Sequence, residues 1–259
     1  MKKIIDGISV ETNGQETNQS IVFIHGFPFD HTLWNDVISD LKDDYYCISY
    51  DIRGFGNSEV NSGQYTMESY TEDLETIISK LELNKPIICG FSMGGYIALR
   101  AIEKVQDNYK ALILANTTTS SDNDEAKLKR ASGISSINKD GIGPFLDKFF
   151  SVAFSDNYSK KEIAKLKSKI VNFSTIGIKG ALLAMISRTD TTENLNKINI
   201  PVLMITSDED KVIPPETMKD MAGKVKNCSF ISLKSSGHLS MLENPKEFTN
   251  ALKAFILII

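Results

Sequence analysis

Residues 87–95, Ile-Ile-Cys-Gly-Phe-Ser-Met-Gly-Gly, form the stretch that decides the fold class. The first five of them, 87–91, are a short apolar run typical of a buried strand, and residues 94–105 place apolar side chains at helical spacing. Ser92 therefore stands at a sharp turn from a strand into a helix. Such a turn forces the serine into strained backbone angles, and the three flanking glycines leave room for it. The pattern predicts a nucleophile elbow with Ser92 as the nucleophile.

The alternation of strand and helix signals extends along the chain on both sides of this turn. Six short apolar runs have the length of buried strands: residues 21–25, 46–50, 87–91, 111–115, 201–206 and 229–233. Runs with apolar residues at helical spacing stand between or after them: residues 32–41, 69–81, 94–105 and 245–255. Strands that alternate with helices indicate a parallel sheet. The sequence therefore predicts an α/β fold with a mostly parallel central sheet flanked by helices.

The alternation stops after residue 116. From there to residue 197 the sequence has only loops and helical signals: residues 125–137, 143–154, 160–173 and 177–188. A long helical stretch inside an α/β repeat indicates an inserted domain. We therefore expect residues 117–197 to form a helical cap, or lid. Residues 1–116 and 198–259 would then form the core domain.

Composition excludes several classes of function. The chain has 259 residues, 41% of them apolar, and a net charge of −4, which gives no support to nucleic-acid binding. No run approaches the roughly 18 apolar residues of a membrane span, and no apolar signal-peptide segment follows the first lysines. We therefore expect a cytoplasmic protein with a small-molecule partner, neither nucleic acid nor membrane. The sequence leaves the oligomeric state open.

The cysteines and histidines do not have the spacing of a metal site. Three cysteines lie far apart, each in an apolar run: Cys47, Cys89 and Cys228. An odd number at wide spacing makes neither a disulfide framework nor a metal cluster. The three histidines are equally scattered, which disfavours zinc. We expect small buried cysteines, and neither a metal nor a cofactor.

A nucleophilic serine needs a base, and the chain has three histidines that are candidates for this role. His25 and His31 precede Ser92, whereas His238 follows it in the segment Ser-Ser-Gly-His, a few residues after the last predicted strand. In folds that use this kind of elbow, the acid and the histidine follow the serine in the chain. The sequence therefore predicts His238 as the general base.

The acid that orients the histidine is expected after the strand 201–206. Three carboxylates are consecutive there: Asp208, Glu209 and Asp210. The residues alone do not choose among them.

Five blocks of the chain together resemble the signature blocks of the α/β-hydrolase superfamily. They are His25-Gly-Phe-Pro28, Asp51-Ile-Arg-Gly-Phe-Gly-Asn-Ser58, Gly90-Phe-Ser-Met-Gly-Gly95, Asp210-Lys-Val-Ile-Pro214 and Gly237-His238. More narrowly they resemble small bacterial carboxylesterases, enol-lactonases and perhydrolases of that superfamily. The resemblance covers essentially the whole chain except the cap. It implies the α/β-hydrolase fold with a helical cap inserted after the sixth strand.

The resemblance also assigns residues that the pattern leaves open. It implies that Asp210, four residues before Pro214, is the acid, with Asp208 as the second candidate. It implies an oxyanion hole made by the backbone N–H groups of Phe27 and Met93. By the same analogy, His25 supports the loop that carries Phe27.

These assignments predict a serine hydrolase that cleaves a carboxylic ester through a Ser92–His238–Asp210 triad and an acyl-enzyme intermediate. A serine at position 92 disfavours the aspartate-nucleophile epoxide hydrolases and dehalogenases of the superfamily. Enol-lactone, thioester and C–C bond hydrolysis and perhydrolysis stay open, because all of them can use the same triad. A ligand receptor or regulator on this scaffold is the alternative of another class, and the intact triad favours an enzyme.

The predicted cap offers two clues to the substrate, and each has two interpretations. Its apolar residues Phe145, Phe149, Phe150 and Met185 either line an acyl pocket or pack the cap on the core. Residues 122–190 carry twelve lysines and arginines against eight aspartates and glutamates. This excess positive charge either attracts anionic acyl groups or belongs to solvated helix faces.

Overall fold

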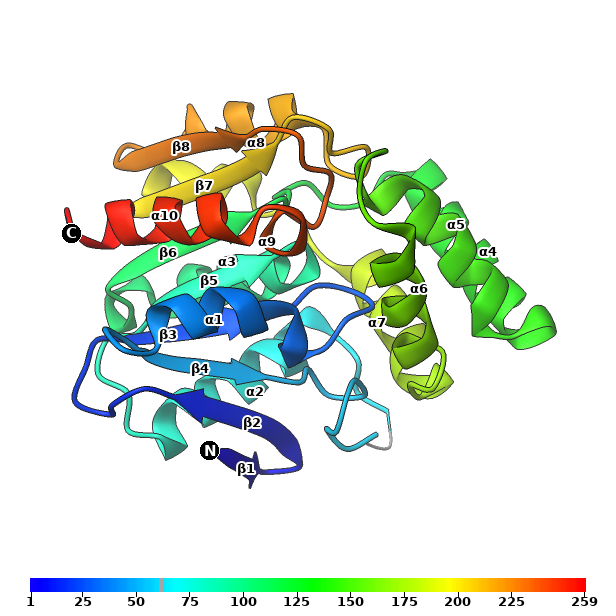
Figure 1. The fold of residues 1–259 in the computed structure, drawn as a ribbon, viewed down its shortest axis with the longest axis horizontal. Helices are drawn as coiled ribbons and strands as arrows, with labels where there is room; N and C mark the ends of the chain where they lie inside the picture. Colours follow the sequence, from blue (N-terminus) through cyan, green and yellow to red (C-terminus); the bar gives the residue numbers. More distant parts are fainter. Residues whose placement is uncertain (61–62) are drawn as a thin grey trace.

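The computed structural model describes residues 1–60 and 63–259, and over these residues it has one eight-stranded sheet (Figure 1). The strand order is β1-β2-β4-β3-β5-β6-β7-β8. In chain order the strands are β1 (Lys2–Ile5), β2 (Ile8–Asn13), β3 (Ser20–Ile24), β4 (Tyr46–Tyr50), β5 (Ile87–Phe91), β6 (Ala111–Ala115), β7 (Val202–Ser207) and β8 (Cys228–Leu233). From β4 to β8 all neighbouring strands pair parallel, whereas β1 and β2 pair antiparallel at one edge. The predicted mostly parallel sheet is confirmed.

Helices cover both faces of this sheet. On one face α1 (Asn35–Leu41) packs against α10 (Pro245–Ile256), and on the other α2 (Met67–Lys80) packs against α3 (Met93–Val105) (Figure 1). The central strands β3 to β6 are buried along their whole length because helices shield them on both sides. This burial explains why they appear in the sequence as continuous apolar runs.

Sequence patterns missed four elements. β1 and β2 form the antiparallel edge, and α8 (Pro215–Ala222) and the short α9 (Ser240–Glu243) flank the last strand. Side chains of β1 alternate between exposed and half-buried, so the strand has too few apolar residues to produce a clear signal. With β1 and β2 counted, β6 is the sixth strand.

Four helices follow β6 before the chain returns to the sheet at β7. They are α4 (Asp124–Asp140), α5 (Ile142–Ala153), α6 (Lys160–Ile170) and α7 (Thr175–Ser187), and we call them the cap. The carboxyl ends of the parallel strands point toward the cap (Figure 1). Among the described residues no single helix is long and apolar enough to cross a membrane; α6 and α7 pass that test only as a pair bent by 102°.

Two close approaches of backbone join the cap to the core. A Cβ on Gly177 of α7 would lie 2.0 Å from the carbonyl oxygen of Gly54, and a Cβ on Gly237 would lie 2.5 Å from the backbone nitrogen of Ser155. The N–H of His238 also donates to the carbonyl of Ala153 at the end of α5, at 2.8 Å. The cap therefore contacts the loop that carries the predicted catalytic histidine.

Candidate active site

Ser92 occupies a strained turn between β5 and α3. Its φ of 50° and ψ of −114° lie in a region that residues with a side chain rarely adopt. The turn is possible because Gly94 has no side chain: a Cβ there would lie 2.3 Å from the carbonyl oxygen of Ile24. The side chain of Ser92 is only part-buried, so its hydroxyl is accessible at the start of α3.

The structure brings the three predicted triad side chains together from three separate loops. His238 Nε2 lies 3.0 Å from Ser92 Oγ, and His238 Nδ1 lies 2.8 Å from Asp210 Oδ2. Asp210 and His238 are 5% and 1% exposed, so water does not compete for this contact. Asp208, in contrast, is exposed, with its carboxylate 3.7 Å from the ammonium group of Lys234. Of the candidate acids, the structure places Asp210 at the histidine.

Both oxygens of the Asp210 carboxylate accept hydrogen bonds. Oδ1 accepts the backbone N–H groups of Val212 and Ile213, both at 2.8 Å, and Oδ2 accepts from Asn116 and His238. Burial opposes ionisation of this carboxyl, but the charge of His238 and these hydrogen bonds outweigh it and hold the pKa of Asp210 below its usual value. Asp210 is therefore ionised at neutral pH and positions the imidazole.

Asn116 is a site residue that the sequence analysis missed. It is fully buried directly after β6, and its side-chain amide donates to Asp210 Oδ2 at 2.9 Å and to Ser207 Oγ at 3.1 Å. Its carbonyl oxygen accepts from Ser240, two residues after His238, at 3.0 Å. A polar residue directly after a buried parallel strand was the signal in the sequence, because the carboxyl ends of neighbouring strands converge.

The two predicted oxyanion donors flank the nucleophile. Met93 directly follows Ser92 and opens α3, whose N-terminus carries partial positive charge. Gly26 lies against the serine, since a Cβ on it would be 3.0 Å from Ser92 Cβ, and Phe27 is the next residue. This placement puts the turn at residues 25–27 beside the position where an oxyanion would form.

Buried histidines hold the loops around this turn. His25 Nε2 accepts the N–H of Ile52 at 2.9 Å, and burial lowers the pKa of His25, which keeps it neutral for this bond. These contacts agree with the expectation that His25 supports the loop that carries Phe27.

A second interaction lies in the loop after β4. Arg53 in this loop makes two hydrogen bonds to the carboxylate of Asp73, at 2.6 and 2.5 Å.

His31 lies between two carboxylates. Its Nδ1 is 2.5 Å from Asp51 Oδ1 and its Nε2 is 3.2 Å from Glu11 Oε2 on β2. Burial disfavours the charged ring, but the hydrogen bond and charge of Asp51, with the charges of Asp30 and Glu11, outweigh it and raise the pKa of His31. Asp30, His31 and Asp51 each have one side-chain nitrogen or oxygen atom that lies within 4.8 Å of those of the other two, a spacing that metal ligands also have. They are already used in hydrogen bonds and ion pairs, including that of Asp30 with Lys169 at 2.6 Å.

The predicted pocket residues divide into two groups. Phe145 and Phe149 line an open groove of about 500 Å³ between α4 and α5, together with Phe27. Phe150 and Met185 are 6% and 3% exposed and pack in the core instead. Of the two interpretations left open by the sequence, these positions favour groove lining for Phe145 and Phe149 and core packing for Phe150 and Met185. The ring of Phe150 stacks on that of Phe29.

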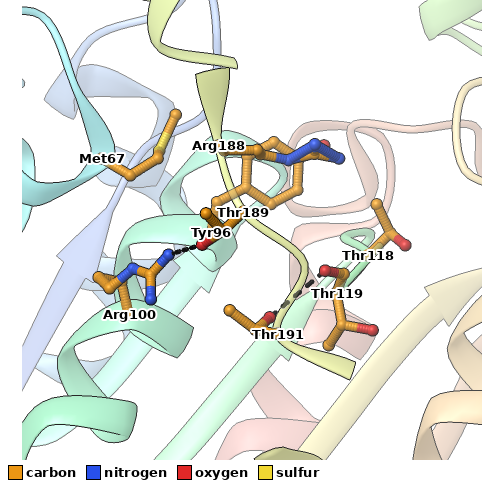
Figure 2. Close-up of a pocket in the computed structure, with 8 residues that line it drawn as sticks. All are labelled: Met67, Tyr96, Arg100, Thr118, Thr119, Arg188, Thr189 and Thr191. Carbon is orange, nitrogen blue, oxygen red and sulfur yellow. Dashed lines mark hydrogen bonds between the residues drawn. The ribbon is translucent and has the colours of Figure 1, made fainter. Parts of the chain in front are cut away.

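A second hollow lies between α3 and the segment after α7 (Figure 2). The guanidinium of Arg188 lies 4.2 Å from the ring centre of Tyr96, and Arg100 donates to Thr189. Its volume of about 10 Å³ has room for no more than a water molecule. This hollow cannot hold an organic substrate.

Comparison with known proteins gives consistent matches. Residues 15–245 match the family model described as serine aminopeptidase, S33. The chain is 28% identical to 3-oxoadipate enol-lactonase 1 of Acinetobacter baylyi, covering 96% of this chain and 92% of that protein. Its structure is similar to that of a thermophilic esterase from Thermogutta terrifontis, with a TM-score of 0.92, 29% identity and coverage of 99% and 97%. A bromoperoxidase from Bacillus anthracis matches with a TM-score of 0.89, 27% identity and 99% coverage of both chains.

Proposed function

Because the chain belongs to the serine aminopeptidase S33 family of α/β hydrolases, we propose that it hydrolyses a carboxylic ester of a small molecule with Ser92, His238 and Asp210 as its catalytic triad. One observation carries this proposal: the hydrogen bonds Ser92–His238–Asp210 form an unbroken chain at 3.0 and 2.8 Å. An activated serine needs this arrangement of nucleophile, base and orienting acid. The esterase and enol-lactonase among the similar proteins support the reaction class.

In the first half of the reaction, the neutral ring of His238 takes the proton of Ser92 as its oxygen attacks the ester carbonyl. The ionised Asp210 keeps the ring oriented and stabilises the imidazolium. The developing oxyanion accepts hydrogen bonds from the N–H groups of Phe27 and Met93. Loss of one such donor typically costs about 3–4 kcal/mol of transition-state stabilisation. The leaving alcohol departs with the proton from His238.

In the second half, a water molecule attacks the acyl-enzyme. His238 takes a proton from this water and then returns it to Ser92 Oγ as the bond between Ser92 and the acyl group breaks and the acid is released. Because each half uses the same base and the same oxyanion donors, no metal or cofactor enters the scheme.

The test is chemical labelling combined with turnover. Purified protein should hydrolyse short p-nitrophenyl esters and be labelled at Ser92 by a fluorophosphonate. Ser92→Ala should lose labelling and at least roughly 10⁴-fold of the turnover. Labelling of the wild type without turnover of any substrate would favour a ligand receptor instead, and the absence of labelling would contradict an activated serine.

Enol-lactone hydrolysis is the second candidate, favoured by the likeness to the Acinetobacter baylyi enol-lactonase. A lactone is a cyclic ester, so the same steps open its ring and release a hydroxy or oxo acid. A panel of an open ester, an enol lactone, a thioester and an aminoacyl anilide, compared by kcat/KM, separates these substrates. The anilide belongs in the panel because the family description names an aminopeptidase.

A further inference from the structure

The groove between α4 and α5 is large and has a distinct composition. Its lining residues are Phe27, Ala126, Lys129, Arg130, Ser132, Gly133, Ser136, Phe145, Lys148, Phe149 and Leu182. We call it the α4–α5 groove. Its volume of about 500 Å³ is in the range of small-molecule sites. The triad mechanism does not use this space.

One residue, Phe27, connects the groove with the turn that lies against the nucleophile. Gly26 lies against Ser92, and the next residue, Phe27, contributes its ring to the groove wall. The ring centre of Phe27 is 5.9 Å from that of Phe145 and 6.3 Å from that of Phe149. Phe27 thus directly follows the residue that lies against Ser92, and its side chain lines the groove. An acyl chain attached to the reacting carbonyl would pass along these three rings.

The charged side chains of the groove all have one sign. Lys129, Arg130 and Lys148 line it, and no aspartate or glutamate is among the described lining residues. Lys148 is exposed and has no carboxylate within 4.0 Å in the part of the chain that the structure describes. The other two cations pair outside the groove: Lys129 with Glu125 at 2.8 Å, and Arg130 with Asp122.

The ion pairs do not cancel this positive charge. Asp122 binds two guanidinium groups at once, those of Arg130 and Arg188, so one carboxylate faces two cations. Lys129 and its partner Glu125 are both exposed, where ion pairs are weak. The groove therefore offers an apolar wall that includes Phe27 and a cationic rim around Lys148.

Building on the proposed function, we propose that the α4–α5 groove binds the acyl chain of the substrate and that its cationic rim binds a carboxylate at the far end of that chain. The substrate class is then an ester or lactone whose acyl part ends in an anion, such as a half-ester of a dicarboxylic acid. The three aromatic rings bind the methylene chain, and Lys148 supplies the free positive charge. This assigns three of the twelve lysines and arginines of residues 122–190 to substrate recognition.

The test compares two esters that differ only in the end of the acyl chain. p-Nitrophenyl hydrogen adipate and p-nitrophenyl hexanoate have the same number of acyl carbons, and the enzyme-free rate is subtracted for each. We expect the wild type to favour the adipate in kcat/KM by about tenfold at low ionic strength. This preference should fall as salt is added, because exposed charges are screened.

Charge reversal locates the effect. Lys148→Glu should lower the adipate-to-hexanoate ratio by about tenfold or more, because it changes the local charge by two units. The matched control is Lys165→Glu on α6, an exposed lysine outside the groove lining, which makes the same change in net charge. The control should leave the ratio unchanged. Fluorophosphonate labelling of Ser92 in each variant shows that its active site is intact.

A second variant tests the groove without changing charge. A Cβ on Gly133 would lie 2.9 Å from the ring of Phe145, so Gly133→Leu fills the groove between α4 and α5. We expect it to raise KM for p-nitrophenyl hexanoate by about tenfold and KM for p-nitrophenyl acetate by less than twofold. Only the longer acyl chain of the hexanoate enters the groove.

The outcomes separate this inference from the proposed function. No preference for the adipate in the wild type, or equal effects of Lys148→Glu and Lys165→Glu on the ratio, would overturn the anion site. Equal increases in KM for the hexanoate and the acetate in Gly133→Leu would overturn the acyl groove. Failure of the proposed function is a different result, in which no ester is hydrolysed and Ser92 is not labelled.

Discussion

Asn116 donates a hydrogen bond to the same oxygen of the Asp210 carboxylate, Oδ2, that His238 contacts. The bond is buried, and hydrogen bonds to charged groups stabilise by about 1.5–3 kcal/mol. The amide therefore contributes to keeping Asp210 ionised.

We predict that Asn116→Gly lowers kcat about tenfold and raises the pKa of Asp210, so that the variant loses the ionised carboxylate at a higher pH than the wild type does. Glycine accepts the φ of 44° that Asn116 adopts, so the change removes the amide without straining the turn. The sign follows from the lost bond, which lowered the pKa of Asp210; without it the carboxyl protonates at higher pH. The measurement is kcat/KM for a neutral ester from pH 4 to 9. A loss of thermal stability with an unshifted profile would mean that Asn116 has only a structural role.

At the scale of elements, the end of α5 and the loop after β8 are packed backbone to backbone. Gly237 has no room for a side chain there, and the N–H of His238 donates to Ala153. The position of His238 therefore depends on where the cap helix ends. This contact couples the cap to the proposed catalytic base.

Gly237→Ala should displace either the end of α5 or the His238 loop. We expect a loss of about 2 kcal/mol or more in the free energy of unfolding and a decrease of kcat of about 100-fold, because small displacements of a base are costly. Thermal unfolding, kcat and the rate of fluorophosphonate labelling measure both effects. Gly223→Ala is the control: it caps α8, has an ordinary φ of −64° and has no heavy atom within 3.5 Å of the added Cβ. If both variants behave alike, the contact at Gly237 does not position His238.

For the whole molecule, the contacts of His31 join the sheet edge to the loops near the active site. The ring connects Glu11 on β2 with Asp51 after β4, and its own segment follows the turn that carries Phe27. Because Asp51 also accepts backbone N–H groups from His31 and Asn57, a change of charge at this ring affects several segments together.

The raised pKa of His31 predicts a pH dependence of global stability. Its contribution is fully present below the unfolded value of 6.5 and is lost as the pH rises through the higher folded value. His31→Gln should therefore destabilise most near pH 5.5, and its difference from the wild type should shrink at alkaline pH. Thermal unfolding from pH 5 to 9 measures this. Glu11→Gln removes one of the two carboxylates and should move the decline to lower pH; a constant difference across the range would contradict a charged His31.

The sequence predicted the parts of this molecule that depend on local spacing. Apolar runs of strand length located β3 to β8, and helical periodicity located the main helices, because burial on a sheet or a helix face imposes those patterns directly. The edge strand β1 escaped detection because half of its residues face solvent. The Ser92 elbow could also be predicted from local spacing, because its strand, turn and helix are contiguous in the sequence.

Contacts between distant segments were decided only by the tertiary structure. Three consecutive carboxylates were indistinguishable as residues, and packing places Asp210 at His238 while Asp208 faces Lys234. The amide of Asn116 meets that carboxylate across 94 residues of chain, and the groove beside Phe27 exists only because α4 and α5 pack next to that turn. Sequence patterns record whether a side chain is buried. They do not record which distant side chain it meets, because that depends on how the strand ends and the cap helices come together in space.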